Sequence, residues 1–259
     1  MKKILITGAN SYIGTSFEKY MSQWPDEYQV DTVDMIDGTW RQKDFSGYDC
    51  VYHVAGIAHI KETADNAHLY YEVNRDLAVE TAQKAKSDGV GQFVFLSTMA
   101  VYGIEEGAIT QNTEPAPKSH YGKAKYEAEL KLNALMDDSF SVAIMRPPMV
   151  YGDGCKGNYQ SLVKFAKQMP FFPDYKNKRS MIHVDRLAWF VKQLVDSNGK
   201  GLILPQDEQY VCTCHMVKEI ADSMGKKLVL LKILNPAVSI VKRFTTAGKK
   251  AFGDLYYER

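Results

Sequence analysis

Residues 7–14 read TGANSYIG, and they directly follow the short apolar run KKILI at positions 2–6. An apolar run that stops at a glycine and gives way to a helix-like pattern over 12–23 indicates a buried strand, a tight turn and a helix. A turn of this kind aims backbone N–H groups and the positive end of the helix dipole at a diphosphate. The stretch therefore predicts a dinucleotide-binding unit at the start of an α/β fold.

Two of the three glycines expected in such a turn are present, at Gly8 and Gly14, whereas Ser11 takes the place of the middle one. The first glycine forms the tight turn, and the last lets helix and strand pack closely. The serine hydroxyl is expected either to cap the helix or to bond a phosphate oxygen. The turn assigns to cofactor binding Gly8, Asn10, Ser11, Tyr12, Ile13 and Gly14.

Asp34 closes the next apolar run, YQVDTVD, 20 residues after Gly14. A carboxylate at this place accepts hydrogen bonds from the ribose hydroxyls of the adenosine and repels a 2′-phosphate. We therefore expect Asp34 to favour NAD over NADP. A capping role in a turn is the alternative.

Strand-like and helix-like runs alternate over the first 146 residues. The strand-like runs are KKILIT, YQVDTVD, CVYHVAG, QFVFLST and SVAIMRP, and the helix-like runs span 12–23, 66–88 and 120–137. This alternation predicts an α/β fold with a Rossmann-type, doubly wound parallel sheet and ligands at the carboxyl ends of the strands. Helical segments continue at 158–168 and 184–197. We expect an NAD-binding domain over 1–150, with 181–198 packing back on it, and a small, reduced, discontinuous substrate lobe over 151–259.

The segment YGKAK at 121–125 places Tyr121 and Lys125 four residues apart, hence on one face of a helix. A tyrosine ionises at about pH 10 and is a weak base at neutral pH, but a nearby ammonium lowers the pKa of the phenol. Such a pair takes a proton from a substrate hydroxyl while a hydride leaves the carbon. Thr98 follows a neighbouring strand and is expected to bond the same oxygen, so these three are the candidate catalytic residues.

Several motifs, in order along the chain, carry a resemblance to a known family: TGANSYIG, VDTVD, CVYHVAGIAHI, YEVNRD, GQFVFLSTMAVYG, YGKAK, RPPMVYGDG and RSMIHVD. The chain resembles an extended short-chain dehydrogenase/reductase of the NAD-dependent epimerase/dehydratase type. The resemblance implies bound NAD, and it implies that the segment from His53 to Gly56 lines the cofactor. It also implies that Asp44 and Phe45 lie beside the adenine. The other implied cofactor contacts are Val54, Ala55, Asn74, Tyr121, Lys125 and Pro148.

Met99 and Ala100 follow Thr98, where related dehydratases and decarboxylases carry acidic residues that move protons. The resemblance therefore disfavours dehydration and decarboxylation, and oxidation or reduction at one carbinol carbon remains as the expected reaction. The stretches RPPMVYGDG, KGNYQSL and KNKRSMIHVD resemble the branch that acts on UDP-linked hexoses and N-acetylhexosamines. This implies that Asn158 contacts the nucleotide and Arg179 the diphosphate, with Thr98 and Met99 toward the sugar. A surface ion pair is the alternative for Arg179.

The first hypothesis is an NAD-dependent epimerase acting at carbon 4 of a UDP-linked hexose or N-acetylhexosamine through a transient 4-keto sugar. An NAD(P)H-dependent 4-ketoreductase of a nucleotide-linked deoxyaminosugar is the alternative with the same triad. The third hypothesis is a non-catalytic NAD- or nucleotide-sensing protein, against which the pair Tyr121 and Lys125 counts. The resemblance also implies a homodimer formed by the helices at 66–88 and 120–137.

Composition and charge narrow the choice of partners. The chain has 259 residues and a net charge of +1, so no global field favours nucleic acid or a membrane surface. The scattered cysteines predict a reducing, cytoplasmic compartment. Cys212 and Cys214 adjoin His215 but lack a second ligand pair at a zinc-like spacing, so we expect no metal. The last 34 residues are basic, which predicts a solvated helix face, with an acidic partner or a phosphate as the alternative.

Overall fold

The computed structural model describes residues 1–58, 60–155 and 157–259, and of Asn158 only the backbone. The chain divides into two units. Unit 1 comprises Met1–Gly103, Pro115–Pro147 and His183–Pro205. Unit 2 comprises Ile104–Glu114, Pro148–Ile182 and Gln206–Arg259.

A parallel sheet forms the centre of unit 1, with the strand order β10-β6-β4-β3-β1-β2. Its strands are β1 (Lys2–Thr7), β2 (Tyr28–Val33), β3 (Cys50–His53), β4 (Gln92–Leu96), β6 (Ser141–Met145) and β10 (Gly201–Ile203). The order reverses beside β1, because the chain runs outward to β2 and then returns to β3 on the other side. Ligands of such sheets bind at the carboxyl ends of the strands at this switch point.

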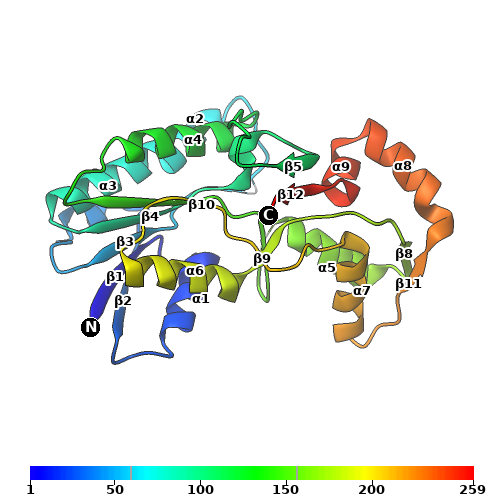
Figure 1. Cartoon of the computed structure of the whole chain (residues 1–259), viewed down its shortest axis with the longest axis horizontal. Coiled ribbons are helices and arrows are strands. Elements are labelled where there is room, and N and C mark those ends of the chain that lie inside the picture. Colours follow the sequence, from blue (N-terminus) through cyan, green and yellow to red (C-terminus); the bar gives the residue numbers. More distant parts are fainter. Residues whose placement is uncertain (59, 156) are drawn as a thin grey trace. The chain divides into compact units, whose positions relative to one another are not determined.

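Helices cover both faces of the sheet, so the predicted doubly wound α/β fold is confirmed (Figure 1). On one face lie α1 (Tyr12–Met21) and α6 (Val184–Ser197), and on the other α2 (Ala67–Tyr71), α3 (Leu77–Ser87) and α4 (His120–Asn133). The helix expected over 66–88 is divided, because the π-helical turn η2 (Glu72–Asp76) separates α2 from α3. Two short 3-10 helices complete the unit, η1 (Thr39–Gln42) and η3 (Met99–Tyr102).

The central strands are buried on both faces, which explains their nearly continuous apolar sequence. Leu5, Val51 and Phe93 are fully buried and belong to one hydrophobic core with the helices on that face of the sheet. The short edge strand β10 was not predicted, since its three residues give too short an apolar run to stand out.

Unit 2 consists of short elements. Its helices are α5 (Asn158–Gln168), α7 (Thr213–Ser223), η4 (Lys232–Leu234), α8 (Asn235–Phe244) and α9 (Thr246–Phe252). Its strands pair as β5 (Gly107–Ile109) with β12 (Leu255–Tyr257), β7 (Met149–Tyr151) with β9 (Met181–His183), and β8 (Phe171–Pro173) with β11 (Val229–Leu231). Across the described parts of both units, none of the helices combines the length and apolarity that a membrane crossing requires.

Candidate active site

The glycine turn after β1 packs tightly against the segment that follows β3. Gly8 has a φ of +104°, and a Cβ there would lie 3.0 Å from the backbone of Ala55. Residues with a side chain rarely adopt this backbone φ, so only glycine fits here without strain. At Gly14, a Cβ would lie 2.7 Å from Ser11 Oγ and 3.2 Å from Ile6, so glycine lets α1 start close to β1.

Ser11 is the N-cap of α1, since its hydroxyl accepts a hydrogen bond from the Gly14 N–H at 3.2 Å. The N–H groups of Tyr12 and Ile13, in the first turn of the helix, have no acceptor within the helix. Asn10, at a φ of +61°, turns the chain into this first turn. The turn thus offers backbone donors and a helix dipole where a diphosphate would sit, and it fits a dinucleotide.

Asp34 lies exposed just beyond β2, and its Oδ1 accepts a hydrogen bond from the Ile36 N–H at 2.8 Å. The other oxygen, Oδ2, accepts no hydrogen bond from any residue that the structure describes, which leaves it available to a ribose hydroxyl. One oxygen of Asp34 therefore caps the turn, and the other remains available as a hydrogen-bond acceptor.

Asp44 and Phe45 have different surroundings. The Asp44 carboxylate is exposed and accepts hydrogen bonds from the N–H and the hydroxyl of Ser46. The Phe45 ring is fully buried in the core, while its N–H donates to Asp88 Oδ2 at 3.0 Å. Because the Phe45 ring is buried, it cannot contact the adenine. An adenine contact by Asp44 or by the backbone of this segment remains a prediction.

His53 ends β3 with its side chain turned into the core, contrary to the expectation that it lines the cofactor. It is fully buried, and its Nδ1 shares a hydrogen bond of 2.7 Å with Thr7 Oγ1. Burial, reinforced by the charge of Lys125, lowers the pKa of His53 to about 3. The imidazole is therefore neutral and ties the ends of β1 and β3 together beneath the site.

The loop after β3 is held by Asn74, which the π-helical turn η2 presents. The fully buried amide accepts from the Ile57 N–H at 3.1 Å and donates to the Ile57 carbonyl at 3.0 Å. A Cβ on Gly56 would lie 2.6 Å from Asn74 Oδ1 and 3.4 Å from Lys125 Nζ. Asn74 thus positions the segment Val54 to Gly56, and this arrangement brings Gly56 beside the Lys125 ammonium.

Thr98 and Tyr121 meet because α4 approaches η3 very closely. Thr98 caps η3 by accepting from the Ala100 N–H at 3.1 Å, and Ser119 caps α4 in the same way. A Cβ on Gly122 would lie 2.9 Å from the Ala100 carbonyl oxygen, so glycine permits this approach. The Thr98 hydroxyl lies near enough to the Tyr121 phenol to lower its pKa.

Lys125 lies one helical turn after Tyr121 and is 4% exposed. Its Nζ donates to the Leu96 carbonyl at 2.9 Å and lies 4.5 Å from the centre of the Phe95 ring. Burial lowers the pKa of Lys125 to about 7, against the opposing charge of Glu129. The residue can therefore gain or lose a proton near neutral pH.

The predicted lowering of the Tyr121 pKa is wrong for the protein without a bound cofactor. Burial raises the pKa of Tyr121 to about 12, and the charge of Tyr70 adds to this, although the Thr98 hydrogen bond acts in the opposite direction. The ammonium of Lys125 is engaged by the Leu96 carbonyl and the Phe95 ring instead. Tyr121 therefore keeps its proton at neutral pH.

Three further groups support this site and were not predicted. Glu62 accepts hydrogen bonds from the N–H groups of His120 and Tyr121, at 2.9 and 3.1 Å. The Tyr70 ring meets Tyr121 edge-on with the ring centres 6.5 Å apart. No sequence signal links these positions, because Glu62 lies 59 residues before Tyr121.

The third group is a buried ion pair below Lys125, between Glu129 and Arg146. The two side chains are 2% and 8% exposed, and two guanidinium nitrogens of Arg146 donate to the carboxylate. Glu129 follows Lys125 by four residues, so the spacing 121, 125 and 129 along α4 was a usable signal.

Pro148, Asn158 and Arg179 belong to unit 2. The Asn158 side chain lies outside the described part of the chain. The Arg179 guanidinium donates to the Gly253 carbonyl at 3.0 Å, and burial lowers the pKa of Arg179. Within the described residues it forms no ion pair, so the surface ion pair considered as an alternative is absent there. Contacts of these three residues with a ligand remain predictions.

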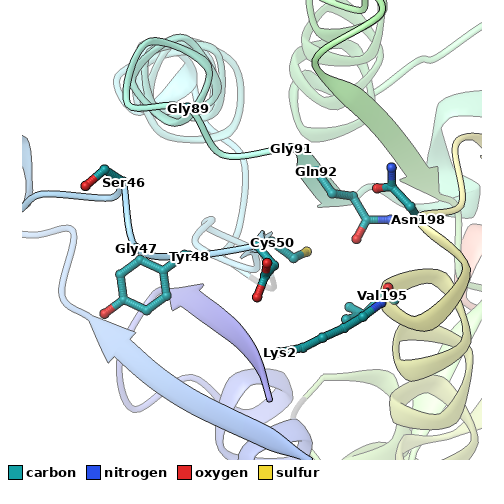
Figure 2. A pocket seen from close by; sticks show the side chains of 11 residues that line it. Lys2, Ser46, Gly47, Tyr48, Cys50, Gly89, Gly91, Gln92, Val195 and Asn198 are labelled. Carbon is teal, nitrogen blue, oxygen red and sulfur yellow. Dashed lines mark hydrogen bonds between the residues drawn. The ribbon is translucent and has the colours of Figure 1, made fainter.

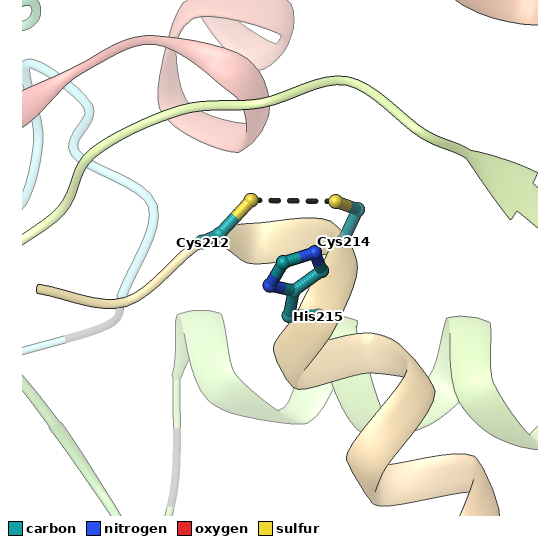
Figure 3. A group of neighbouring side chains, drawn as sticks. All are labelled: Cys212, Cys214 and His215. Carbon is teal, nitrogen blue, oxygen red and sulfur yellow. Dashed lines mark hydrogen bonds between the residues drawn. The ribbon is translucent and has the colours of Figure 1, made fainter. Parts of the chain in front are cut away.

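Cys212, Cys214 and His215 come together at the start of α7, with their ligand atoms within 4.8 Å of one another (Figure 3). The two sulfurs lie 3.3 Å apart. The Lys176 ammonium lies 2.6 Å from His215 Nε2 and 2.8 Å from Asp174 Oδ1. The Lys176 ammonium therefore already contacts the imidazole and the carboxylate that a metal ion would need. We propose no metal site here, and the absence of a metal remains a prediction.

A pocket of 370 Å³ lies at the opposite edge of the sheet of unit 1 (Figure 2). Lys2, Cys50 and Gln92 line it, and they are the first residues of β1, β3 and β4. In parallel sheets ligands bind at the carboxyl ends of the strands. The pocket is therefore separate from the candidate active site, whose glycine turn, Asp34, Val54–Gly56 segment and Thr98 follow the carboxyl ends of strands.

Comparison with known proteins agrees with this geometry. Residues 4–202 match the model of the NAD dependent epimerase/dehydratase family. The chain is 31% identical over 253 residues to a UDP-glucose 4-epimerase of Vibrio cholerae, which covers 87% of this chain and 76% of that protein. It is 25% identical to an N-acetyl-alpha-D-glucosaminyl-diphospho-ditrans,octacis-undecaprenol 4-epimerase of Escherichia coli O157:H7, covering 90% and 76%.

Among solved structures, the fold resembles dTDP-4-dehydrorhamnose reductase of Bacillus anthracis, solved in complex with NADP. The TM-score is 0.74 at 21% sequence identity, over 89% of this chain and 84% of that one. This likeness supports the fold alone. The family model spans most of the chain and includes the glycine turn and the residues around Tyr121. The chain is therefore an enzyme of the NAD dependent epimerase/dehydratase family.

Proposed function

We propose that the chain epimerises carbon 4 of a UDP-linked hexose or N-acetylhexosamine by transient oxidation to the 4-keto sugar. The observation that carries the proposal is the convergence of Thr98, Tyr121 and Lys125 at the carboxyl edge of the sheet. The similarity to the Vibrio cholerae enzyme, a UDP-glucose 4-epimerase, supports the choice of carbon 4 and of a UDP-sugar.

The residues proposed to hold NAD lie at the ends of β1, β2 and β3. Gly8 to Gly14 would receive the diphosphate, Asp34 the ribose, and Val54 to Gly56 the nicotinamide half. Bound NAD supplies the hydride acceptor for carbon 4. The open oxygen of Asp34 and its negative charge support NAD rather than NADP.

The proton of the sugar 4-hydroxyl goes to Tyr121 in this proposal, with Thr98 hydrogen-bonded to the same oxygen, while carbon 4 loses a hydride. Tyr121 must first become a phenolate, although burial raises its pKa to about 12. We expect that pKa to fall once positive charge lies beside the phenol, either on Lys125 or on a bound ligand. The 4-keto sugar then turns, and carbon 4 regains the hydride on its other face.

Neighbouring side chains favour simple redox chemistry at one carbon. Met99 is buried, and Ala100 is the next residue, so neither position following Thr98 carries a group that transfers protons. Abstraction of a proton at carbon 5, which dehydration and 3,5-epimerisation require, therefore has no acid or base at these positions. A carbon-4 epimerase needs none beyond Tyr121.

A sugar diphosphate carried on a lipid is a second candidate substrate. The Escherichia coli relative acts, by its name, on N-acetylglucosaminyl-diphospho-undecaprenol, and it aligns over 90% of this chain. The sugar diphosphate is common to both candidates. In either, we propose that Arg179 binds the diphosphate, because a guanidinium pairs two of its donors with phosphate oxygens.

We further propose a homodimer formed through the helical segments 66–88 and 120–137, in which Leu69 and Leu130 are 40% and 53% exposed. The cysteines of the chain are free thiols, which supports the proposed cytoplasmic location.

The experiment that tests the function begins with denaturation of the purified protein and mass spectrometry of the small molecules released. NAD is the expected product, in about one equivalent. The intact protein is then incubated with UDP-glucose and with UDP-N-acetylglucosamine, without added cofactor. Formation of a 4-epimer supports the proposal. Absence of a 4-epimer from both sugars would contradict it. In a parallel reaction with a nucleotide-linked 4-keto sugar, stoichiometric consumption of added NADH or NADPH would identify a ketoreductase.

A further inference from the structure

Helix α8 of unit 2 presents large apolar side chains to the solvent. Ile240 and Phe244 on this helix are 61% and 75% exposed, and Ile233 just before it is 84% exposed. Val241 is 46% exposed. Soluble proteins rarely leave such residues together on one surface without a binding partner.

The helical geometry gathers these residues into one stripe. At 3.6 residues per turn, Pro236, Ala237, Ile240, Val241 and Phe244 fall within an arc of about 140°. The opposite side holds the helix to unit 2 through the buried Val238 and through Lys242, which pairs with Glu106. Asn235 adds a hydrogen bond to the Asp174 carbonyl at 3.1 Å. The apolar stripe is thus the face left open.

The segment that contains this stripe is basic. Residues 226–253 carry cationic side chains and no Asp or Glu, although the whole chain has a net charge of only +1. The cations are Lys226, Lys227, Lys232, Lys242, Arg243, Lys249 and Lys250. Lys232, Arg243 and Lys250 are exposed beside the stripe or on α9. Figure 1 shows α8 and α9 as consecutive orange and red helices.

We propose that residues 232–250, the basic apolar face, dock onto the surface of a bilayer that contains anionic lipid. Apolar side chains flanked by Lys and Arg are typical of helices that lie in the membrane interface. At ten residues, α8 is roughly 15 Å long, so it would lie along the surface rather than cross the bilayer. A second copy of the chain is disfavoured as the occupant, because two such faces would bring like charges together.

This inference goes beyond the proposed function, and it revises the sequence-based expectation that no membrane is a partner. The net charge of the whole chain does not reveal this basic segment, because acidic residues elsewhere balance its cations. Docking here would hold the enzyme at a surface where lipid-linked sugar diphosphates reside. Lipid binding is measured without substrate or cofactor, so its failure leaves the epimerase proposal untouched.

The experiment is flotation of the full chain with vesicles of phosphatidylglycerol and phosphatidylethanolamine, compared with vesicles of phosphatidylcholine alone. We expect at least tenfold tighter binding to the anionic vesicles, weakened by salt. Ile240→Glu with Phe244→Glu should reduce binding at least tenfold. Ile36→Glu is the matched control, because Ile36 is 92% exposed in unit 1, and it should bind like wild type. Circular dichroism confirms that each variant folds.

A second readout uses Phe244→Trp, whose fluorescence should shift to the blue on anionic vesicles and be quenched by brominated lipid. Absence of wild-type binding, or equal binding by the Ile240→Glu/Phe244→Glu variant, would overturn the proposal. Conversion of a dimer to a monomer by that variant, without any effect on lipid binding, would identify the face as a subunit interface instead.

Discussion

At the scale of single residues, Lys125 stands out because its ammonium is buried. Among the residues that the structure describes, its direct partners are the Leu96 carbonyl and the Phe95 ring. Burial lowers the pKa of this lysine and raises that of Tyr121, so in the cofactor-free protein both side chains favour their neutral forms. If Tyr121 acts as the proposed base, its phenol must lose a proton that burial retains. Its phenolate forms only when positive charge accumulates in the site.

The buried lysine predicts a pH dependence of stability. Lys125 releases its proton at about pH 7 in the folded protein but at its ordinary value of 10.5 when unfolded. Between these values the unfolded state binds more protons, so stability rises with pH by up to about 1.4 kcal/mol per unit. Urea unfolding of cofactor-free protein from pH 7 to 9 should show this rise, and Lys125→Met should flatten it. Identical slopes in the two proteins would contradict the burial of a protonatable Lys125.

Removal of the phenol should abolish the proton transfer and little else. Tyr121→Phe is expected to lower kcat about 10²- to 10⁴-fold, since this is the usual contribution of a general base. Most of the bound NAD should remain, because the glycine turn and Asp34 are unchanged. Tyr126→Phe, on the same helix, is the matched control and should retain activity. Full activity of Tyr121→Phe would show that another group carries the proton.

At the scale of elements, the contacts at the start of α4 determine where Tyr121 lies in the candidate active site. Ser119 caps the helix, Glu62 accepts two of its free N–H groups, and Gly122 lets it approach η3. These contacts come from three separate segments of unit 1. Together they hold Tyr121 beside Thr98.

Gly122→Ala tests this close approach. In an ordinary helix the change to alanine stabilises by about 1 kcal/mol, but here the added Cβ would lie 2.9 Å from the Ala100 carbonyl oxygen. We expect a lower melting temperature and at least a tenfold lower kcat, because the turn must move away from Thr98. Gly47→Ala is the control, since a Cβ there meets nothing within 4 Å. A more stable and fully active Gly122→Ala would refute the argument.

At the scale of the whole molecule, the sequence predicted the fold of unit 1 well because its signals are local. Apolar runs, helix periods and glycine turns each lie within a dozen residues, and the parallel sheet follows from their alternation. The side-chain surroundings could not be predicted in this way. The burial of Phe45 and His53, and the reversed pKa shift of Tyr121, depend on contacts between segments far apart in the chain.

Unit 2 gave weaker signals, because its strands have only three residues each and its helices are separated by irregular loops. The basic composition of its last part was visible, but the exposed apolar stripe on α8 was not. That stripe appears only once the structure shows which side of the helix is buried. In the proposed function, Arg179 of unit 2 contacts the substrate, and Thr98, Tyr121 and Lys125 of unit 1 carry out the chemistry.

In the proposed reaction, carbon 4 gives up a hydride and regains the same hydride. UDP-glucose and UDP-N-acetylglucosamine labelled with deuterium at carbon 4 test this directly, in the purified protein with its own bound cofactor. We expect a 4-epimer that retains the deuterium at carbon 4, with no NAD or NADH added. Loss of the label from the product, or absence of any epimer from both sugars, would contradict it.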